Sequence, residues 1–168
     1  MSDRVVGPLR EMRLPLHDGL SALHVAATAA TTAELPIAMK ALDGALAFLQ
    51  ERILPICRAE EFTLFIAVDG VLGAVDSCQV MKMQHSTMMR MTGDLAQTIE
   101  AAKADGDVAA YAKYLHPLLY GLYALIRAHL ESEDDAYLPL LDTALSESQV
   151  TMIMDNMTRM AAGSAAPE

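Results

Sequence analysis

The chain has 168 residues, of which 53% are apolar, and carries a formal net charge of −10 from 22 acidic and 12 basic residues. This length fits one domain with a sizeable core, and the acidic balance argues against nucleic acid and anionic membrane surfaces as partners. The sequence has no uncharged apolar stretch long enough to predict a membrane span, and its first residues lack the apolar stretch of a signal peptide. The two cysteines are too few for a disulfide framework, so we expect a cytoplasmic protein.

Apolar residues recur at helical spacing along most of the chain, and no β-hairpin signal or internal repeat interrupts them. Pro55 and Pro117 are expected to kink their helices, and Asp107 and Ser146 are expected to cap the starts of theirs. The predicted helices cover about 15–33, 36–65, 75–103 and 107–139, with a short fifth helix from about 146.

The economical architecture for these segments is all-α, an antiparallel up-down four-helix bundle with an additional short C-terminal helix. We expect residues 1–14 to form a loose lead-in, residues 15–141 to form the bundle, and residues 142–168 to hold the last helix and a frayed tail.

His129 and Glu133 lie four residues apart on a predicted helix, so their side chains leave the same face one turn apart. An imidazole and a carboxylate in this arrangement are a common metal-binding unit of helical bundles. The bland alternative is an ordinary pair of side chains that stabilises the helix by a few tenths of a kcal/mol.

Residues at equal distances from a turn lie at the same height in an up-down bundle. His85 and His129 lie almost equally far before and after the turn at Gly106, and Cys57 and His85 do so around the turn near Val71. His17 fits this height better than His24 does, and His116 falls at the wrong height. One layer of the bundle is therefore expected to hold six candidate ligands: His17, Cys57, Glu61, His85, His129 and Glu133.

The donors in this layer resemble the ligand pattern of the hemerythrin-like (HHE cation-binding) domain family over most of residues 15–141. That pattern is a lone His, an HxxxE, a further His and a second HxxxE. The matching pieces are His17, the stretches LPICRAEEFTLF (54–65) and MQHSTM (83–88), and LLYGLYALIRAHLESEDDAYLPLL (118–141). Cys57 stands where the first HxxxE has its His, and Met89 stands where many hemerythrins have another His.

Three alternatives stay open at this stage. His24 is the alternative to His17 as a ligand, and Cys57 is either a soft thiolate donor or a buried neutral thiol. Glu60, Asp134 and Asp135 are expected to be solvated, with Glu60 or Asp134 as alternative extra carboxylates.

The carboxylate share of the donor set and the resemblance together imply iron, as two ions or alternatively one, ahead of zinc or manganese. The implied function is a non-haem iron protein that binds, senses or reduces a small oxidant such as O2, NO or peroxide. A different class remains as the alternative: a degenerate bundle in which Cys57 acts as a thiol-based redox sensor, or an interaction module with a partial or empty metal site. The sequence does not give the oligomeric state.

Overall fold

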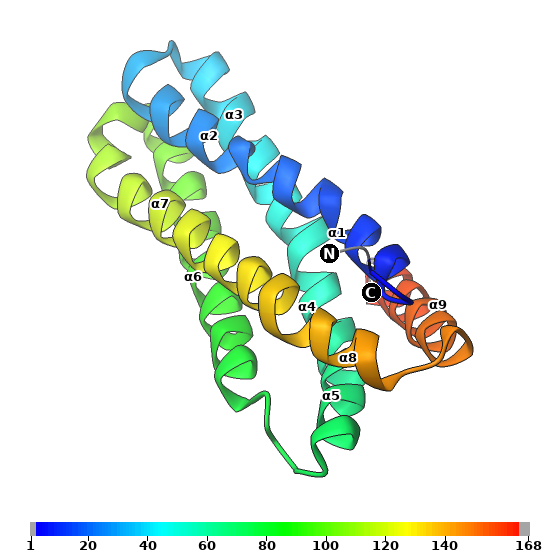
Figure 1. The fold of residues 1–168 in the computed structure, drawn as a ribbon. Helices are drawn as coiled ribbons and strands as arrows, with labels where there is room; N and C mark the ends of the chain where they lie inside the picture. Colours follow the sequence, from blue (N-terminus) through cyan, green and yellow to red (C-terminus); the bar gives the residue numbers. More distant parts are fainter. Residues whose placement is uncertain (1–2, 165–168) are drawn as a thin grey trace.

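The structure is a computed structural model that describes residues 3–164, and in that range it contains helices and connecting turns but no strand. Figure 1 shows the helices packed side by side as long rods. Their bounds are α1 (Gly7–Gly19), α2 (Ser21–Thr32), α3 (Leu35–Phe48), the π-helical turn η1 (Leu49–Ile53), α4 (Leu54–Phe62), α5 (Leu64–Leu72), α6 (Gln79–Asp105), α7 (Val108–Ser132), the π-helical turn η2 (Glu133–Tyr137), α8 (Leu138–Ala144) and α9 (Glu147–Ser164).

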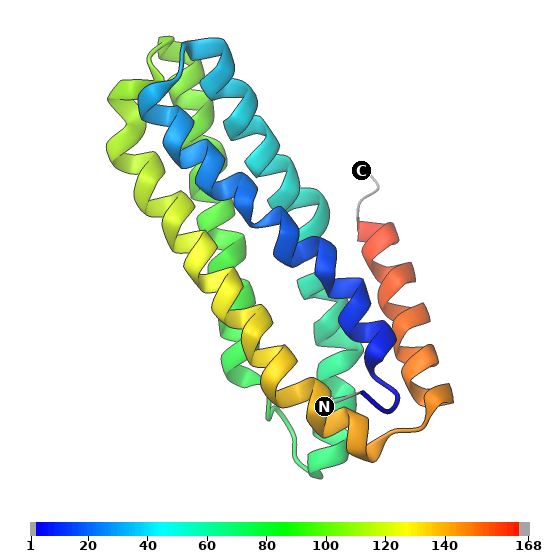
Figure 2. The ribbon, with the colours of Figure 1, turned by 45° about the horizontal axis from the view of Figure 1, so that its top comes forward.

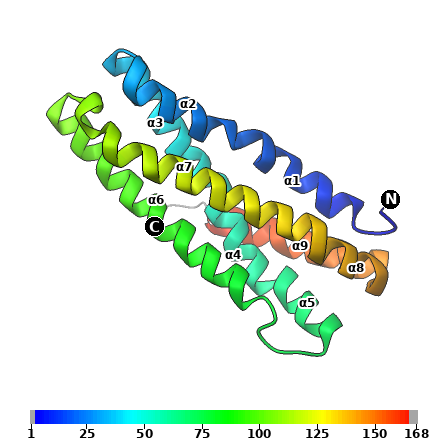
Figure 3. The same cartoon turned by 60° about the vertical axis from the view of Figure 1, so that its left-hand side comes forward.

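The rods alternate in direction, so the predicted all-α bundle is confirmed. The α2–α3 and α6–α7 turns lie at one end of the bundle, and the α5–α6 loop lies at the other end (Figures 1 and 3). Helix α9 packs against α4 and runs beside α1 (Figure 2). It has 18 residues, so it is longer than the short helix expected. None of the described helices is long and apolar enough to cross a membrane.

Two of the predicted helix starts carry the expected caps. The side chain of Asp107 accepts a hydrogen bond of 3.0 Å from the backbone N–H of Ala110. Ser146 and Gln149 form a reciprocal pair, in which the backbone N–H of Ser146 donates to Gln149 Oε1 at 2.9 Å and that of Gln149 donates to Ser146 Oγ at 3.4 Å. These bonds satisfy backbone donors that a helix start leaves free.

Two of the prolines follow irregular turns within the long helical rods. Each π-helical turn ends directly before a Leu-Pro pair, at Leu54-Pro55 and at Leu138-Pro139. Because proline has no backbone N–H, the regular α-helical bond cannot form there, and a wider turn takes its place. The kink expected at Pro55 is thus preceded by η1, whereas α7 continues through Pro117.

The N-terminal segment differs most from the expectation. Residues 1–14 were expected to be a loose lead-in, but the chain is helical from Gly7 and runs through Pro15 to Gly19. The long first rod is divided there into α1 and α2. A Cβ atom on Gly19 would collide with the ring of Phe48, so a larger residue there would require the Phe48 side chain to move. The last four residues of the predicted frayed tail lie outside the described part of the chain.

The interior contains two apolar clusters with a polar layer between them. On α1 the layer residue Arg13 lies between Leu9 of one cluster and Leu16 of the other. His85 lies in the same way between Met81 and Met88 on α6. The polar layer, as we use the term below, consists of five buried side chains: Arg13, Glu60, His85, His129 and Glu133.

Candidate metal centre

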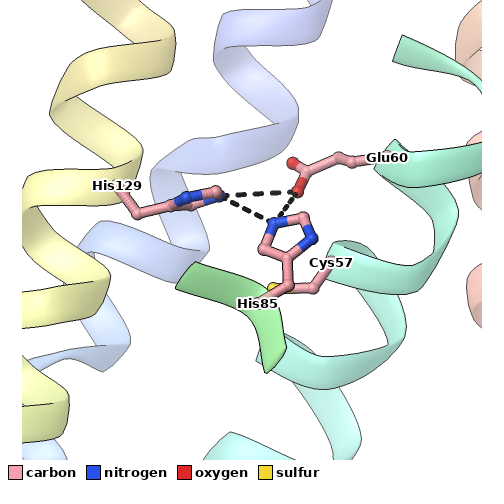
Figure 4. A group of neighbouring side chains, drawn as sticks. All are labelled: Cys57, Glu60, His85 and His129. Carbon is pink, nitrogen blue, oxygen red and sulfur yellow. Dashed lines mark hydrogen bonds and ion pairs between the residues drawn. The ribbon is translucent and has the colours of Figure 1, made fainter. Parts of the chain in front are cut away.

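Four buried side chains from three rods bring potential metal donors together. They are Cys57 and Glu60 from α4, His85 from α6 and His129 from α7, and one donor atom from each lies within 4.8 Å of the others (Figure 4). The Nε2 atoms of the two histidines are 3.0 Å apart, and Glu60 Oε2 lies 3.4 Å from His85 Nε2. Each of the four residues is at most 6% exposed, so water contributes little to their solvation.

Hydrogen bonds on the outer side of each imidazole orient the rings. His85 Nδ1 lies 2.9 Å from Glu61 Oε1, and His129 Nδ1 lies 2.9 Å from Gln84 Oε1. Because both partners are acceptors, each Nδ1 carries the hydrogen and each Nε2 presents its lone pair. Such outer partners fix the tautomer of metal-binding histidines.

The space between the two inward-facing Nε2 atoms contains neither a positive charge nor a hydrogen-bond donor. With both Nδ1 atoms protonated, two Nε2 lone pairs face each other across 3.0 Å, which is repulsive unless a proton or a cation lies between them. Glu133 Oε1, which lies 3.6 Å from His129 Nε2, is buried without a hydrogen-bond partner. Imidazole nitrogens, carboxylate oxygens and a nearby thiol are donors that suit a transition-metal ion, so these residues fit one.

Arg13 supplies the one fixed positive charge in the polar layer. Its Nη2 atom is 3.0 Å from Glu60 Oε1 and 2.7 Å from Glu133 Oε2. Burial opposes its charge, but the two carboxylates raise the pKa of Arg13, so it stays protonated. Burial and the nearby charge of Glu60 raise the pKa of Glu133. Burial opposes the charged form of Glu60 as well, yet the pKa of Glu60 is lowered, with the charge of Arg13 among the causes.

Cys57 lies at the edge of the cluster as a protonated thiol. Its Sγ atom is 3.9 Å from Met88 Sδ. Burial raises the pKa of Cys57, and the charges of Glu60, Glu133 and Glu61 raise it further. A thiol of this kind reacts slowly with oxidants, because the thiolate is the reactive form. A cation bound beside it would reverse this preference.

The six residues singled out in the sequence have different surroundings. Four of them, His85, His129, Glu133 and Cys57, lie in or against the cluster, whereas Glu61 lies at the outer nitrogen of His85. His17 is outside the cluster and lies 3.0 Å from Asp134 Oδ2, with its side chain 30% exposed. The alternative His24 is also outside it and packs edge-on against Tyr123.

The match to known proteins is at the level of the family. The family model described as the hemerythrin HHE cation binding domain matches residues 15–141. The chain belongs to this hemerythrin family. Searches of curated proteins and of solved structures each gave no match. Membership identifies a metal-binding domain, and the buried Cys, Glu, His, His group is consistent with a Cys replacing one His of the hemerythrin pattern.

A cavity of about 400 Å³ reaches this hemerythrin centre from the outside. It opens between α4 and α6, and Cys57 and His85 form part of its wall together with Glu61, Met89 and Arg58. The cavity thus borders Met89, the position at which the sequence departs from the pattern of many hemerythrins. A small molecule could therefore approach the cluster there.

Two members of the polar layer were not predicted as site residues. Arg13 fell in the expected lead-in, although its spacing from Leu9 and Leu16 already places it on an apolar helix stripe. Glu60 was expected to be solvated but is 1% exposed. Positions three and four residues after Cys57 both lie on its side of the helix, so spacing alone does not choose between Glu60 and Glu61.

Proposed function

We propose that this hemerythrin-family chain is a non-haem iron protein that binds, senses or reduces a small oxidant such as O2, NO or peroxide. His85 Nε2, His129 Nε2 and a Glu60 oxygen would hold the iron, with Glu133 and Cys57 as further donors. The observation that carries the proposal is the pair of inward-facing Nε2 atoms 3.0 Å apart, with Glu133 Oε1 buried and unpaired beside them.

The surrounding residues support a small and reactive partner rather than a large substrate. The cluster is buried, and the cavity of about 400 Å³ beside Cys57 and His85 is its approach from the surface. Iron held in this site would supply redox chemistry and a free coordination position. Glu61 and Gln84 hold the imidazoles in place, and Phe65, stacked on the His85 ring with centroids 5.3 Å apart, helps to exclude water.

Residue chemistry favours iron over purely structural zinc. Structural zinc sites use four Cys or His ligands, whereas this cluster contains one thiol and at least one carboxylate. The metal-free thiol sensor gains no support from the geometry, since the pKa of Cys57 is raised by burial and the thiol is 6% exposed.

Metal analysis of protein from iron-replete cells tests this function. We expect iron in stoichiometric amounts, absorbance between about 300 and 400 nm, and a spectral change when NO or peroxide is added to the reduced protein. A double variant, His85→Ala with His129→Ala, should lose the iron, while His24→Ala should keep it. Less than about a tenth of an equivalent of iron in the unaltered chain would contradict the proposal. Iron without a response to any oxidant would leave a metal protein but remove the oxidant function.

A further inference from the structure

Arg13 is the largest fully buried side chain of the described residues, and its surroundings are incomplete. Its Nη2 atom contacts both Glu60 and Glu133, but its Nε and Nη1 atoms are buried without hydrogen-bond partners. Unpaired buried donors are costly, so hydrogen bonding does not by itself explain this placement. The two carboxylates hold the guanidinium there.

Both carboxylates divide their oxygens between two positions. Glu60 directs Oε1 to Arg13 and Oε2 toward His85 Nε2, at 3.0 and 3.4 Å. Glu133 directs Oε2 to Arg13 and Oε1 toward His129 Nε2, at 2.7 and 3.6 Å. Two carboxylates that span two cation positions are typical of dinuclear centres in helical bundles. In this chain one of the two positions contains the Nη2 atom of Arg13.

Space and charge both oppose a metal ion in that position. Metal–carboxylate bonds are about 2.0–2.2 Å long, so an ion bound to Glu60 Oε1 and Glu133 Oε2 would overlap Nη2. A displaced guanidinium would also lose its ion pairs with Glu60 and Glu133; the charge of Asp134 acts on Arg13 too, but no ion pair joins these two residues in the described part of the chain. Arg13 comes two residues before the segment 15–141 that matches the family, so it adds to the family pattern from outside.

We propose that Arg13 takes the place of a second metal ion, and that this chain therefore binds a single ion between His85, His129 and Glu60. This inference rests on the proposed function in one respect, namely that the cluster binds metal. The new claim is that Arg13 limits the number of bound ions to one.

Counting ions in wild type and in Arg13 variants tests the inference. The metal-stripped chain is reloaded with excess Mn²⁺, freed of loose ion, and measured for metal per chain and by electron paramagnetic resonance. We expect one Mn²⁺ per wild-type chain with the spectrum of an isolated ion. Arg13→Ala should bind close to two, with the additional lines of spin-coupled ions. Arg13→Lys, which keeps the charge, and Arg10→Ala, which removes a half-exposed arginine one turn away, should each bind one.

The outcomes separate the two proposals. Two ions in the wild-type chain would overturn this inference and leave the metal function intact. One ion in both wild type and Arg13→Ala would equally overturn the role of Arg13. A wild-type chain that binds no Mn²⁺ here and no iron in the metal analysis above would contradict the proposed function itself. If Arg13→Ala does not fold, Arg13→Gln, which removes the charge but fills more of the space, is judged by the same count.

Discussion

The two ends of the bundle are built from the same kind of helix but in opposite ways. Toward the α2–α3 turn the interior is mostly apolar, with Leu23, Leu42, Leu95 and Leu115 fully buried and Thr92 as a buried polar side chain among them. Beyond Leu16 and Met88, the same rods bring a guanidinium, carboxylates and imidazoles inward instead. The first region is stable through the packing of its own side chains. The second keeps buried charges and, at Glu133 Oε1, an unpaired acceptor that a bound cation would satisfy.

The irregular turns lie toward the polar layer. The turn η2 begins with Glu133 itself, whereas η1, whose Leu49 and Ile53 belong to the apolar cluster of the first region, ends one turn before Cys57. In the described part of the chain, the rods near the other end are regular α-helices. Wide turns of this kind occur often at functional sites, where they redirect side chains from a regular helix. We infer that the helices depart from regular α-helical geometry at the polar end so that the metal-donor side chains point inward.

Removing the buried charge should produce the largest loss of stability. Arg13→Met leaves Glu60 and Glu133 buried without a charge partner, which costs about 3–5 kcal/mol in the metal-free chain. Urea unfolding in the presence of a chelator measures this loss. The control Arg10→Met removes the ion pairs of a partly exposed arginine with Asp3 and Asp134 and should cost less than about 1 kcal/mol. Equal losses for both variants would show that the polar layer is no more demanding than the surface.

A cavity in the apolar end should cost almost as much, but independently of metal. Leu95→Ala truncates a fully buried side chain and is expected to lower the free energy of unfolding by about 2–5 kcal/mol. The loss should be the same with and without bound metal, because Leu95 lies outside the polar layer. Val25→Ala, at a residue 60% exposed, should change stability by less than about 0.5 kcal/mol. A metal-dependent effect of Leu95→Ala would contradict the view that the apolar end is stabilised independently of the metal centre.

Metal should stabilise the chain only through the polar end. At a free metal concentration of 100 times Kd, binding to the folded state adds about 2.7 kcal/mol. His129→Ala should abolish most of this gain. His116→Ala should keep it, because His116 contacts the backbone carbonyl of Ala27 rather than the cluster. Thermal unfolding with and without metal measures the stabilisation in each variant. An equal stabilisation of His129→Ala and His116→Ala by metal would show that the metal binds elsewhere.

The smallest expected effect tests a local feature at the apolar end. Asp107→Ala removes the side-chain bond to the N–H of Ala110 at the start of α7, which costs about 1 kcal/mol. Metal content should not change, since this cap lies at the far end of the helix from His129. A lower metal content in this variant would show that the two ends are coupled through α7.

The sequence contained most of the fold and only part of the site. Apolar spacing, turn residues and the caps at Asp107 and Ser146 depend on local chemistry, so the bundle could be predicted. Comparing heights across turns was enough to predict that His85 and His129 lie level, since it needs only the helix rise. The π-helical turns were not predicted, because their tertiary environment decides between a kink and a wide turn.

Sequence spacing does not specify the rotation of individual side chains. His17 lies close to the right height, yet its side chain contacts Asp134 instead of the cluster. The choice of Glu60 over Glu61 for the interior depends on the orientation of α4, which is set by packing against α6 and α9. Arg13 required knowing that the chain before Pro15 is helical.

Anomalous diffraction at the iron absorption edge, on crystals of protein from iron-replete cells, tests the central claim most directly. We predict one anomalous peak within bonding distance of the Nε2 atoms of His85 and His129, with Glu60 as a neighbouring ligand and Arg13 still between the carboxylates. The absence of a peak at these two nitrogens, or a peak beside His17, would contradict the account.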